Sequence, residues 1–555
     1  ATQMAHRAQS ILVQMFGLPE DGIRVITPHV GGGFGPKFVF YQEEAVIPFA
    51  AMQLGRPVKW IEDRREHFTA TTTQRDQFWQ LEVAVTGEGR IIGLRGNVTH
   101  EQGAWVPYGV LLAFSSLAPL PSAYSIAAVD VGLDIVYTNT TPNTPVRGAG
   151  RPYANYAVER MIQTVARGLG IDQAEVRRRN LIRADQMPYE TGATLRDGSK
   201  ARYDSGDYHA CLDKALTLAD WDGFAARRAT SEKAGRLRGI GIACFLEVAG
   251  GILEETADLR FEGDGYATVR LGVQAMGQSH LSTYTRLVGD RLGIPPSRVR
   301  LIEGDSLEAP PGTPSVASRS MMMAGSAMAM GCDVAIERGR ALAGHVLEAA
   351  VEDVEFDAGN FRIRGTDRVI GILDLAERIR TVELPDELAG GMDAREMFES
   401  AQMTFPNGCH ICEVEIDPDT GALDVARYAA VDDVGNVFDE MVVEGQIHGG
   451  IAQGLGQVLG EQVVYDDDGQ LMTGSFMDYM MPRADDLPML DVGHHSVPAT
   501  TNPLGAKGAG ESGVAGALPS GMAAVADALA SAGKGPIDLP MTPARIWVAL
   551  QNQGD

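Results

Sequence analysis

Residues 505–513 read Gly-Ala-Lys-Gly-Ala-Gly-Glu-Ser-Gly and set one carboxylate, Glu511, among residues that have almost no side chain. The segment lies in a stretch that begins at Ser496 and carries, ahead of Glu511, no charge except that of Lys507. A large ligand can approach such a carboxylate closely, and if the ligand excludes water, the proton affinity of the carboxylate rises. These properties suit a general base, and the alternative is a loop carboxylate with no part in catalysis.

Two more glycine-rich segments lie far from this one in the sequence, Gly31-Gly-Gly-Phe-Gly-Pro-Lys37 and Arg147-Gly-Ala-Gly-Arg-Pro152. The first follows a short apolar run but fits neither common nucleotide motif. Its glycines are not spaced for a dinucleotide fold, and it has no Gly-Lys-Ser/Thr sequence. Three such segments, one of them with a carboxylate, predict a large ligand enclosed by backbone.

Composition limits the classes of function. The chain has 555 residues, which predicts about two to four domains, and 45% of its residues are hydrophobic, which predicts substantial cores. A net charge of -26 argues against nucleic-acid binding and against docking on an anionic membrane. The first residues lack the apolar segment of a signal peptide. The longest uncharged run, Gln102 to Val129, contains three prolines, so we expect a buried loop or pocket wall there and no membrane insertion.

Cysteines are few for a chain of this length, which favours a reducing, cytoplasmic compartment over a disulfide framework. They are Cys211, Cys244, Cys332, Cys409 and Cys412. The last two form a Cys-x-x-Cys pair that runs into the strand-like Glu413-Val-Glu-Ile416, with no second Cys/His pair nearby. We therefore expect a strand with two incidental thiols rather than a zinc site, and the chain has no iron–sulfur cysteine pattern.

Short predicted strands and helices alternate without an internal repeat, which indicates an α+β multidomain fold with mixed sheets and packed helices. The charged segment 225–238 is the best candidate for a domain boundary, so we expect one domain over residues 1–235 and a second over 236–555. Expected helices cover residues 2–16, 42–54 and 153–169, a further helix is capped by Asp172, and others begin at His280 and Gly325. Expected strands cover residues 23–27, 239–247 and 267–273, with hairpins over 83–94 and 413–424.

Polar groups follow several of these elements. Met276-Gly-Gln278 offers backbone amides and a side-chain amide after a strand, and Gln446 adds another amide beside glycines. Ser318-Arg-Ser320 places hydroxyls and an arginine at the start of an expected helix, where a pyrophosphate could bind.

Taken together, these residues resemble the molybdopterin-binding large subunit of the xanthine oxidase (molybdenum hydroxylase) family. The resemblance covers nearly the whole chain and rests on an ordered set of motifs. The set is Thr2-Gln3, Gly31–Lys37, Val146-Arg147-Gly148, Ala275–Gln278, Ala317–Ser320, Gly445-Gln446 and Gly508–Gly513. The two expected domains then correspond to the two cofactor-binding domains of that family.

The resemblance implies a role for each matched residue. Glu511 is expected to be the general base, Gln3 to hydrogen-bond an oxo ligand of molybdenum, and Arg147 to lie beside the metal, although it could instead cap a helix near Tyr153. The cofactor-binding set is expected to be Gly33, Phe34, Gly35, Met276, Gly277, Gln278, Ser318, Arg319, Ser320, Gln446 and Gly510. The metal is held through the pterin in this family, so no protein ligand is expected. His280, His410 and His448 are interpreted as local hydrogen-bonding residues.

Departures from the family pattern bear on the substrate. Purine-oxidising members carry a glutamate where this chain has Phe38, an arginine in the region of residues 114–117, and an aromatic residue at the position of Ala149. Carbon monoxide dehydrogenases carry a copper-binding cysteine where this chain has Gly148. Xanthine and carbon monoxide are therefore disfavoured. Phe38, Trp105, Tyr108, Tyr124 and Ala149 are candidates for the substrate pocket, and core packing is the alternative for the aromatic residues.

Family chemistry implies a hydroxylase in which Glu511 takes a proton from a water-derived nucleophile. The oxygen then attacks an electron-poor carbon, most readily that of an N-heteroaromatic compound, and two electrons leave for carriers that this chain lacks. We expect an iron–sulfur subunit, a flavin subunit and a molybdopterin cytosine dinucleotide cofactor. The family's usual N-terminal segment is expected on a separate chain or to have been removed. An aldehyde oxidoreductase and a non-catalytic cofactor-binding scaffold remain the alternatives.

Overall fold

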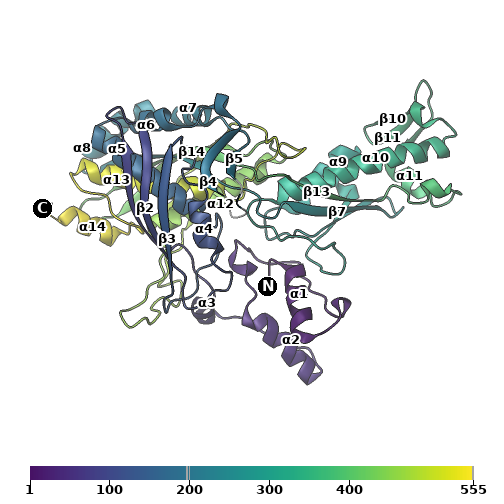
Figure 1. The fold of residues 1–555 in the computed structure, drawn as a ribbon, viewed down its shortest axis with the longest axis horizontal. Helices are drawn as coiled ribbons and strands as arrows, with labels where there is room; N and C mark the ends of the chain where they lie inside the picture. Colours follow the sequence, from purple (N-terminus) through teal and green to yellow (C-terminus); the bar gives the residue numbers. More distant parts are fainter. Residues whose placement is uncertain (195–197, 199, 553–555) are drawn as a thin grey trace.

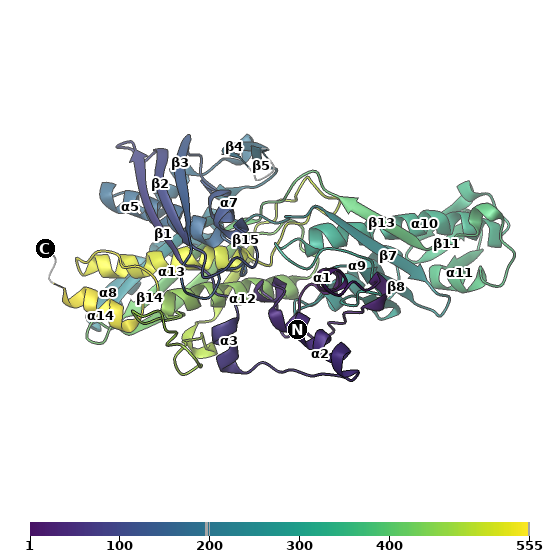
Figure 2. The ribbon, with the colours of Figure 1, turned by 60° about the horizontal axis from the view of Figure 1, so that its bottom comes forward.

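The computed structural model describes residues 1–194, 198 and 200–552. It is an elongated molecule with a larger lobe at one end, an arm at the other, and an N-terminal segment along one side (Figures 1 and 2). Several mixed sheets with helices packed on them make an α+β fold, which confirms the predicted fold class. The boundary expected near residue 235 stays a prediction, and one of the three clusters of buried apolar side chains contains residues from both sides of it.

The larger lobe is built on a four-stranded sheet in the order β16-β15-β14-β6. Its strands are β6 (Leu237–Leu246), β14 (Asn407–Ile416), β15 (Leu423–Asp433) and β16 (Leu490–His494). Helix α13 (Ser512–Ser531) packs closely on β6, because a Cβ at Gly241 would lie 2.2 Å from the backbone of Ala524 and Ser520. Only glycine permits this approach, which fixes the start of α13, directly after Glu511.

A second sheet and several helices complete the larger lobe. Strands β1 (Gln77–Val85), β2 (Ile91–Glu101) and β3 (Ala128–Val136) form the sheet, with β1 antiparallel and β3 parallel to β2. The helices here are α4 (Leu111–Leu117), α5 (Arg151–Leu169), α6 (Gln173–Asn180), α7 (Tyr208–Leu218), α8 (Phe224–Lys233), α12 (Glu440–Leu459) and α14 (Pro543–Gln551), and β4 (Tyr189–Thr194) pairs with β5 (Lys200–Tyr203).

The arm contains residues from about 250 to 400. Its main sheet has the order β13-β7-β8-β9, with β7 (Glu254–Phe261), β8 (Ala267–Leu271), β9 (Val299–Ile302) and β13 (Ala394–Glu399). Helices α9 (His280–Leu292) and α10 (Ser326–Val346) lie along it, and α11 (Ile372–Arg378) and a small sheet complete the far end (Figure 1). The small sheet consists of β10 (Val354–Asp357), β11 (Asn360–Ile363) and β12 (Val369–Gly371).

The N-terminal segment carries α1 (Ala5–Phe16), α2 (Gln42–Leu54) and α3 (Arg64–Ala70) and runs beneath the junction of lobe and arm (Figure 1). Helix α13 is the one helix of the described residues that is long and apolar enough to cross a membrane. Within it, 89% of the apolar window is buried inside the protein, as expected for a core helix.

Most predicted elements are confirmed within a few residues, including α1, α2, α5, α9, both hairpins and the Asp172 cap of α6. One prediction is wrong. Residues 23–27 form only an isolated bridge from Ile26 to Asp305, because the residues opposite them, 304–306, are a bend and turn rather than a strand. The charged segment at which the boundary is expected is mostly helix α8, and ion pairs join this helix to β14 through Arg227 and Glu413 and to α13 through Arg228 and Asp527.

The Cys-x-x-Cys pair lies on β14, as predicted. Its two cysteines are three residues apart on a strand, so they face opposite sides of the sheet and enter different cores. All five cysteines are buried and free in the described part of the chain.

Candidate active site

A cavity of about 1030 Å³ lies where the N-terminal segment, the arm and the larger lobe meet. Thirteen of the fourteen predicted catalytic and cofactor-binding residues line it, although they come from seven separate stretches of the chain. They are Gln3, Gly33, Phe34, Gly35, Arg147, Met276, Gly277, Gln278, Ser318, Ser320, Gln446, Gly510 and Glu511. Tertiary structure therefore brings together residues that the sequence separates by as many as 508 positions.

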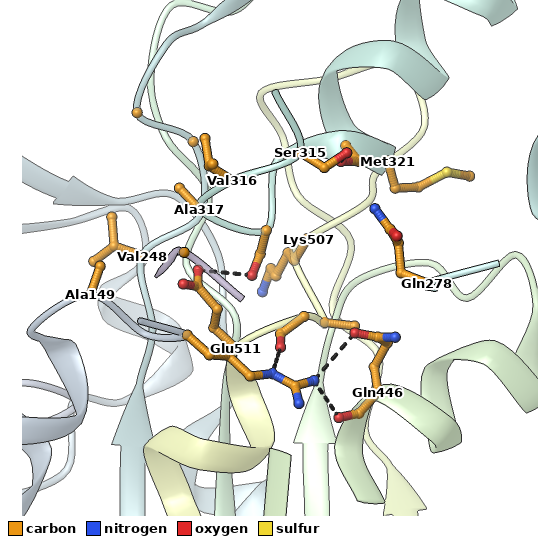
Figure 3. A pocket seen from close by; sticks show the side chains of 18 of the residues that line it. Ala149, Val248, Gln278, Ser315, Val316, Ala317, Met321, Gln446, Lys507 and Glu511 are labelled. Atoms are coloured by element: carbon orange, nitrogen blue, oxygen red, sulfur yellow. Dashed lines mark hydrogen bonds between the residues drawn. The ribbon is translucent and has the colours of Figure 1, made fainter. Parts of the chain in front are cut away.

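Glu511 is the N-cap residue of α13, and its carboxylate is held by three donors. The backbone N–H of Gly148 donates to Oε1 at 2.6 Å, and the hydroxyl of Ser318 and Nη2 of Arg151 donate to Oε2 at 2.9 and 3.0 Å. Figure 3 shows the Glu511 side chain between Ala149 and Val248 on one side and Lys507 on the other, with Gln278 and Gln446 across the cavity. The side chain is 10% exposed, so it reaches the cavity while most of it is shielded from water.

Arg147 fastens two of the glycine-rich segments to each other. Its Nε donates to the carbonyl of Gly510, and its Nη2 donates to the carbonyl of Gln446 at 2.7 Å and to the side-chain oxygen of Gln446 at 3.2 Å. Burial lowers the pKa of Arg147 to about 10, and the nearby charge of Glu511 opposes this shift. The guanidinium lies 5.9 Å from the ring centre of Phe34. Arg147 therefore fixes the loop that carries Glu511 and does not cap a helix.

Gln3 is held by hydrogen bonds to the glycine-rich segment Gly31–Lys37. Its side-chain oxygen accepts a hydrogen bond from the backbone N–H of Gly35 at 3.0 Å, and its backbone N–H donates to the carbonyl of Lys37. The Gln3 amide group is thereby oriented at the cavity wall, with its NH₂ end left to donate.

Glycines at the cavity wall, here called the glycine cradle, let the loops pack closely. A Cβ at Gly33 would lie 2.3 Å from the sulfur of Met276, and a Cβ at Gly35 would lie 2.0 Å from the carbonyl of Pro145. At Gly510, a Cβ would lie 3.1 Å from the hydroxyl of Ser318. Glycine is therefore needed at these positions for the contact of the loops with the protein around them.

Two buried polar atoms at the cavity wall have no protein hydrogen-bond partner among the described residues, Nε2 of His280 and Oγ1 of Thr283. Nδ1 of His280 contacts Glu303 at 2.9 Å, which supports its interpretation as a local hydrogen-bonding residue. Unsatisfied buried groups are rare and mark a place where a polar ligand belongs. Together with the glycine cradle and the amides of Gln278 and Gln446, they fit a molybdopterin with a polar tail.

Three sequence-based predictions are wrong in the structure. The Arg319 side chain is fully buried away from the cavity, where it pairs with Glu255 at 2.7 Å and donates to the carbonyls of Ile252 and Glu254. Tyr124 is a core residue that donates to Glu159, and Trp105 lines a separate pocket near Tyr465. In each case the sequence showed the residue type but not the direction of the side chain.

Phe38, Tyr108 and Ala149 do line the cavity, as predicted. The Phe38 and Tyr108 rings contact each other with centroids 5.0 Å apart. The uncharged run 102–129 supplies Tyr108, Leu111, Ser115, Ala118 and Pro119 to the cavity, which confirms its interpretation as a pocket wall.

Sequence reasoning missed two charged residues next to Glu511. Arg151 belongs to one of the quoted glycine-rich segments, and Glu247 follows the apolar strand β6. A carboxylate at the end of a buried strand was the available signal, because charged groups are rarely buried without a partner.

Comparisons with known proteins agree with this geometry. Residues 1–181 and 214–488 each match a model described as a molybdopterin cofactor-binding domain. The chain is 34% identical to the carbon monoxide dehydrogenase large chain of Hydrogenophaga pseudoflava, over 99% of this chain and 70% of the relative. It is 33% identical to subunit gamma of the 6-hydroxypseudooxynicotine dehydrogenase complex of Paenarthrobacter nicotinovorans, over 99% and 69%. The structure superposes on quinoline 2-oxidoreductase from Pseudomonas putida 86 with a TM-score of 0.93 and 32% identity, over 100% of this chain and 72% of the other.

Proposed function

The chain belongs to the xanthine oxidase family as a molybdopterin-binding large subunit, and on that premise we propose that it hydroxylates an N-heteroaromatic compound. The observation that carries the proposal is the position of Glu511, a largely buried carboxylate at a cavity whose nearby wall is apolar and partly aromatic. Such a wall suits a flat, weakly polar ring. One similar structure is named for quinoline, which is a compound of this class.

The residues of the chain divide the work in this proposal. Bound molybdopterin would supply the metal that accepts two electrons from the substrate. Glu511 accepts a proton from the water-derived nucleophile, while Gly148, Ser318 and Arg151 hold its carboxylate in place. Gln3 would donate from its amide to the ligand sphere of the metal, and Gln278, Ser320 and Gln446 would hold the pterin and its tail.

We propose the cytosine dinucleotide form of the cofactor because His280 and Thr283, which line the cavity with Gln278, offer unsatisfied polar atoms to a polar tail. Two relatives are named as a large chain and as a complex subunit, so this family works with partner chains. We propose an iron–sulfur subunit and a flavin subunit as those partners, since the cysteines of this chain are few, buried and scattered.

Carbon monoxide is a poor candidate for the substrate, although one relative is named for it. The position at which that chemistry needs a cysteine is Gly148, whose φ is +95°. A Cβ there would lie 2.4 Å from Cγ of Pro152, so the backbone of this chain leaves no room for a thiol.

Replacement of the base tests the proposal. We expect Glu511→Gln to lower turnover by about 10²–10⁴-fold, because the amide keeps the size of the side chain but cannot accept the proton. Molybdenum content, and the CMP that acid hydrolysis releases, should stay near those of the unaltered protein. In isotopically labelled water, the unaltered enzyme should place solvent oxygen in the product.

Glu44→Gln is the matched control, since Glu44 caps α2 through the backbone N–H of Tyr41 and does not line the cavity. It should retain turnover. Near-normal turnover of Glu511→Gln at full molybdenum loading would exclude Glu511 as the general base and would favour the alternative that the chain is a non-catalytic cofactor-binding scaffold.

A further inference from the structure

Arg151 lies between two buried carboxylates. Its Nε contacts Oε1 of Glu247 at 2.5 Å, and its Nη2 contacts Oε2 of Glu511 at 3.0 Å. The Glu247 side chain is fully buried, and those of Arg151 and Glu511 are 9% and 10% exposed. One guanidinium therefore serves two carboxylates at a site largely closed to water.

Rigid elements fix this arrangement. Arg151 is the first residue of α5, Glu247 directly follows β6, and Glu511 directly precedes α13. Helix α13 packs on both α5 and β6. The three charged groups therefore cannot move apart without opening the core of the larger lobe.

The two carboxylates are not equivalent. Both oxygens of Glu511 accept hydrogen bonds, from Gly148, Ser318 and Arg151. At Glu247, Oε1 accepts from Arg151 and from the backbone N–H of Val248, but Oε2 has no partner among the described residues. An ionised oxygen without a donor is costly in a buried site, whereas a protonated carboxyl group carries its own donor.

The electrostatic environment also favours a protonated Glu247 and an ionised Glu511. Burial raises the pKa of Glu247 to about 8; the charge of Arg151 opposes this shift and that of Glu511 adds to it. The pKa of Arg151 is raised although burial opposes it, because two carboxylates face the guanidinium. The other charged groups that act on this cluster are Arg147 and Arg75, whose pKa values burial lowers and the carboxylates raise. When both glutamates are ionised, Glu247, Arg151 and Glu511 together carry a net charge of −1, which the charges of Arg147 and Arg75 oppose.

We propose that Glu247 holds a proton and, through Arg151, sets how strongly Glu511 attracts one. With Glu247 neutral, the whole charge of Arg151 acts on Glu511 and keeps it ionised, ready to accept a proton. With Glu247 ionised, the guanidinium is shared and Glu511 becomes a stronger base. Glu247 and Arg151 are positioning residues, and this inference rests on the proposed role of Glu511.

Infrared titration of the carboxyl groups tests the coupling without any turnover. The unaltered protein should lose the band of a buried protonated carboxyl group near pH 8, and Glu247→Gln should lack that band. In Glu511→Gln, which leaves Glu247 in place, the midpoint should move down by about one pH unit or more, because a neighbouring negative charge has gone. A midpoint that does not move in Glu511→Gln, or no titrating band between pH 5 and 9, overturns the proposal.

The pH profile of kcat/KM in the assembled holoenzyme is the second readout. The unaltered enzyme should gain about threefold or more as Glu247 ionises near pH 8, since a coupling of about one pK unit changes proton affinity tenfold and proton transfer follows part of that change. Glu247→Gln should lack this upper rise. An identical rise in Glu247→Gln would refute the proposal.

Glu159→Gln is the matched control, because Glu159 is equally buried and paired with an arginine, but that arginine is Arg177 and not the Arg151 that donates to Glu511. It should lose only its own infrared band and keep the upper rise. If the holoenzyme hydroxylates no substrate while the infrared coupling is present, the proposed function fails and the coupling stands. If turnover is normal and the infrared coupling is absent, the coupling between Glu247 and Glu511 is refuted and the proposed function stands.

Discussion

At the scale of single residues, the site depends on positions where a side chain would not fit. Gly148 both donates its N–H to Glu511 and follows Arg147, which fastens the loop ahead of α13. A residue with a Cβ would have to adopt φ of +95° and displace Pro152. The glycine is therefore needed both for the backbone and for the base.

We expect Gly148→Ala to lower the free energy of unfolding by about 1–3 kcal/mol, because strained backbone and steric overlap both oppose the native loop. Turnover should fall as well, since the donor to Glu511 shifts. Gly170→Ala is the control: Gly170 also has positive φ, but nothing lies within 4 Å of its Cβ position. In urea unfolding, Gly170→Ala should lower the free energy of unfolding by less than Gly148→Ala does. Equal losses in the two variants would contradict the steric argument.

At the scale of elements, α8 shows how a charged segment becomes part of the core structure. Arg227 of α8 and Arg238 of β6 both pair with Glu413 of β14, at 2.6 and 2.7 Å. The Glu413 side chain is only 2% exposed. Two arginines of the charged segment that suggested a domain boundary therefore bind α8 and β6 to β14.

We expect Glu413→Gln to lower the free energy of unfolding by about 1–3 kcal/mol, because it removes the buried carboxylate that two arginines share and leaves them only their pairs with Asp220 and Glu415. Urea unfolding measures the change. Turnover of the folded variant should persist, since Glu413 does not line the cavity. Glu355→Gln, which breaks an exposed pair with Arg364, should have no measurable effect. Similar losses in both variants would show that burial is not the cause.

At the scale of the whole molecule, the cavity joins parts that otherwise have separate cores. Its walls come from the N-terminal segment, the start of the arm near Gln278 and Ser318, and the larger lobe near Gln446 and Glu511. A cofactor bound there contacts all three parts. Its binding free energy therefore adds to the stability of their arrangement.

We expect cofactor-free protein to show faster hydrogen exchange in the loops 31–37, 275–280, 315–320 and 505–511 than cofactor-loaded protein. The core of β6, β14 and α13 should exchange at the same slow rate in both, because its contacts are independent of the ligand. A cofactor present at a thousand times its Kd adds about 4 kcal/mol of stability. Uniform protection of the four loops in both samples would contradict a shared binding site.

Much of the site could be predicted because short, ordered motifs carry it. The glycines next to Glu511, Arg147 and Phe34 form patterns that are visible in the chain itself, although the atoms that a Cβ at Gly33 or Gly35 would meet, in Met276 and Pro145, are far away in the sequence. Arg319 was misassigned because it lies in the same motif as Ser318 and Ser320, although its side chain points into the arm toward Glu255. Neighbours in sequence share a loop but not a direction.

The sequence by itself determined the class of fold, most of the helices and hairpins, the family and the loops that line the cavity. These features depend on local patterns of glycine, polar and apolar residues. Only the tertiary structure decided which charges meet. Glu247 and Arg151 are 96 positions apart in the sequence, and Arg151 and Glu511 are 360 positions apart, so no local sequence pattern predicts their contacts. Their pairing follows from the close packing of α13 on β6 and α5, which forces three buried charges together and makes each one's proton affinity depend on the others.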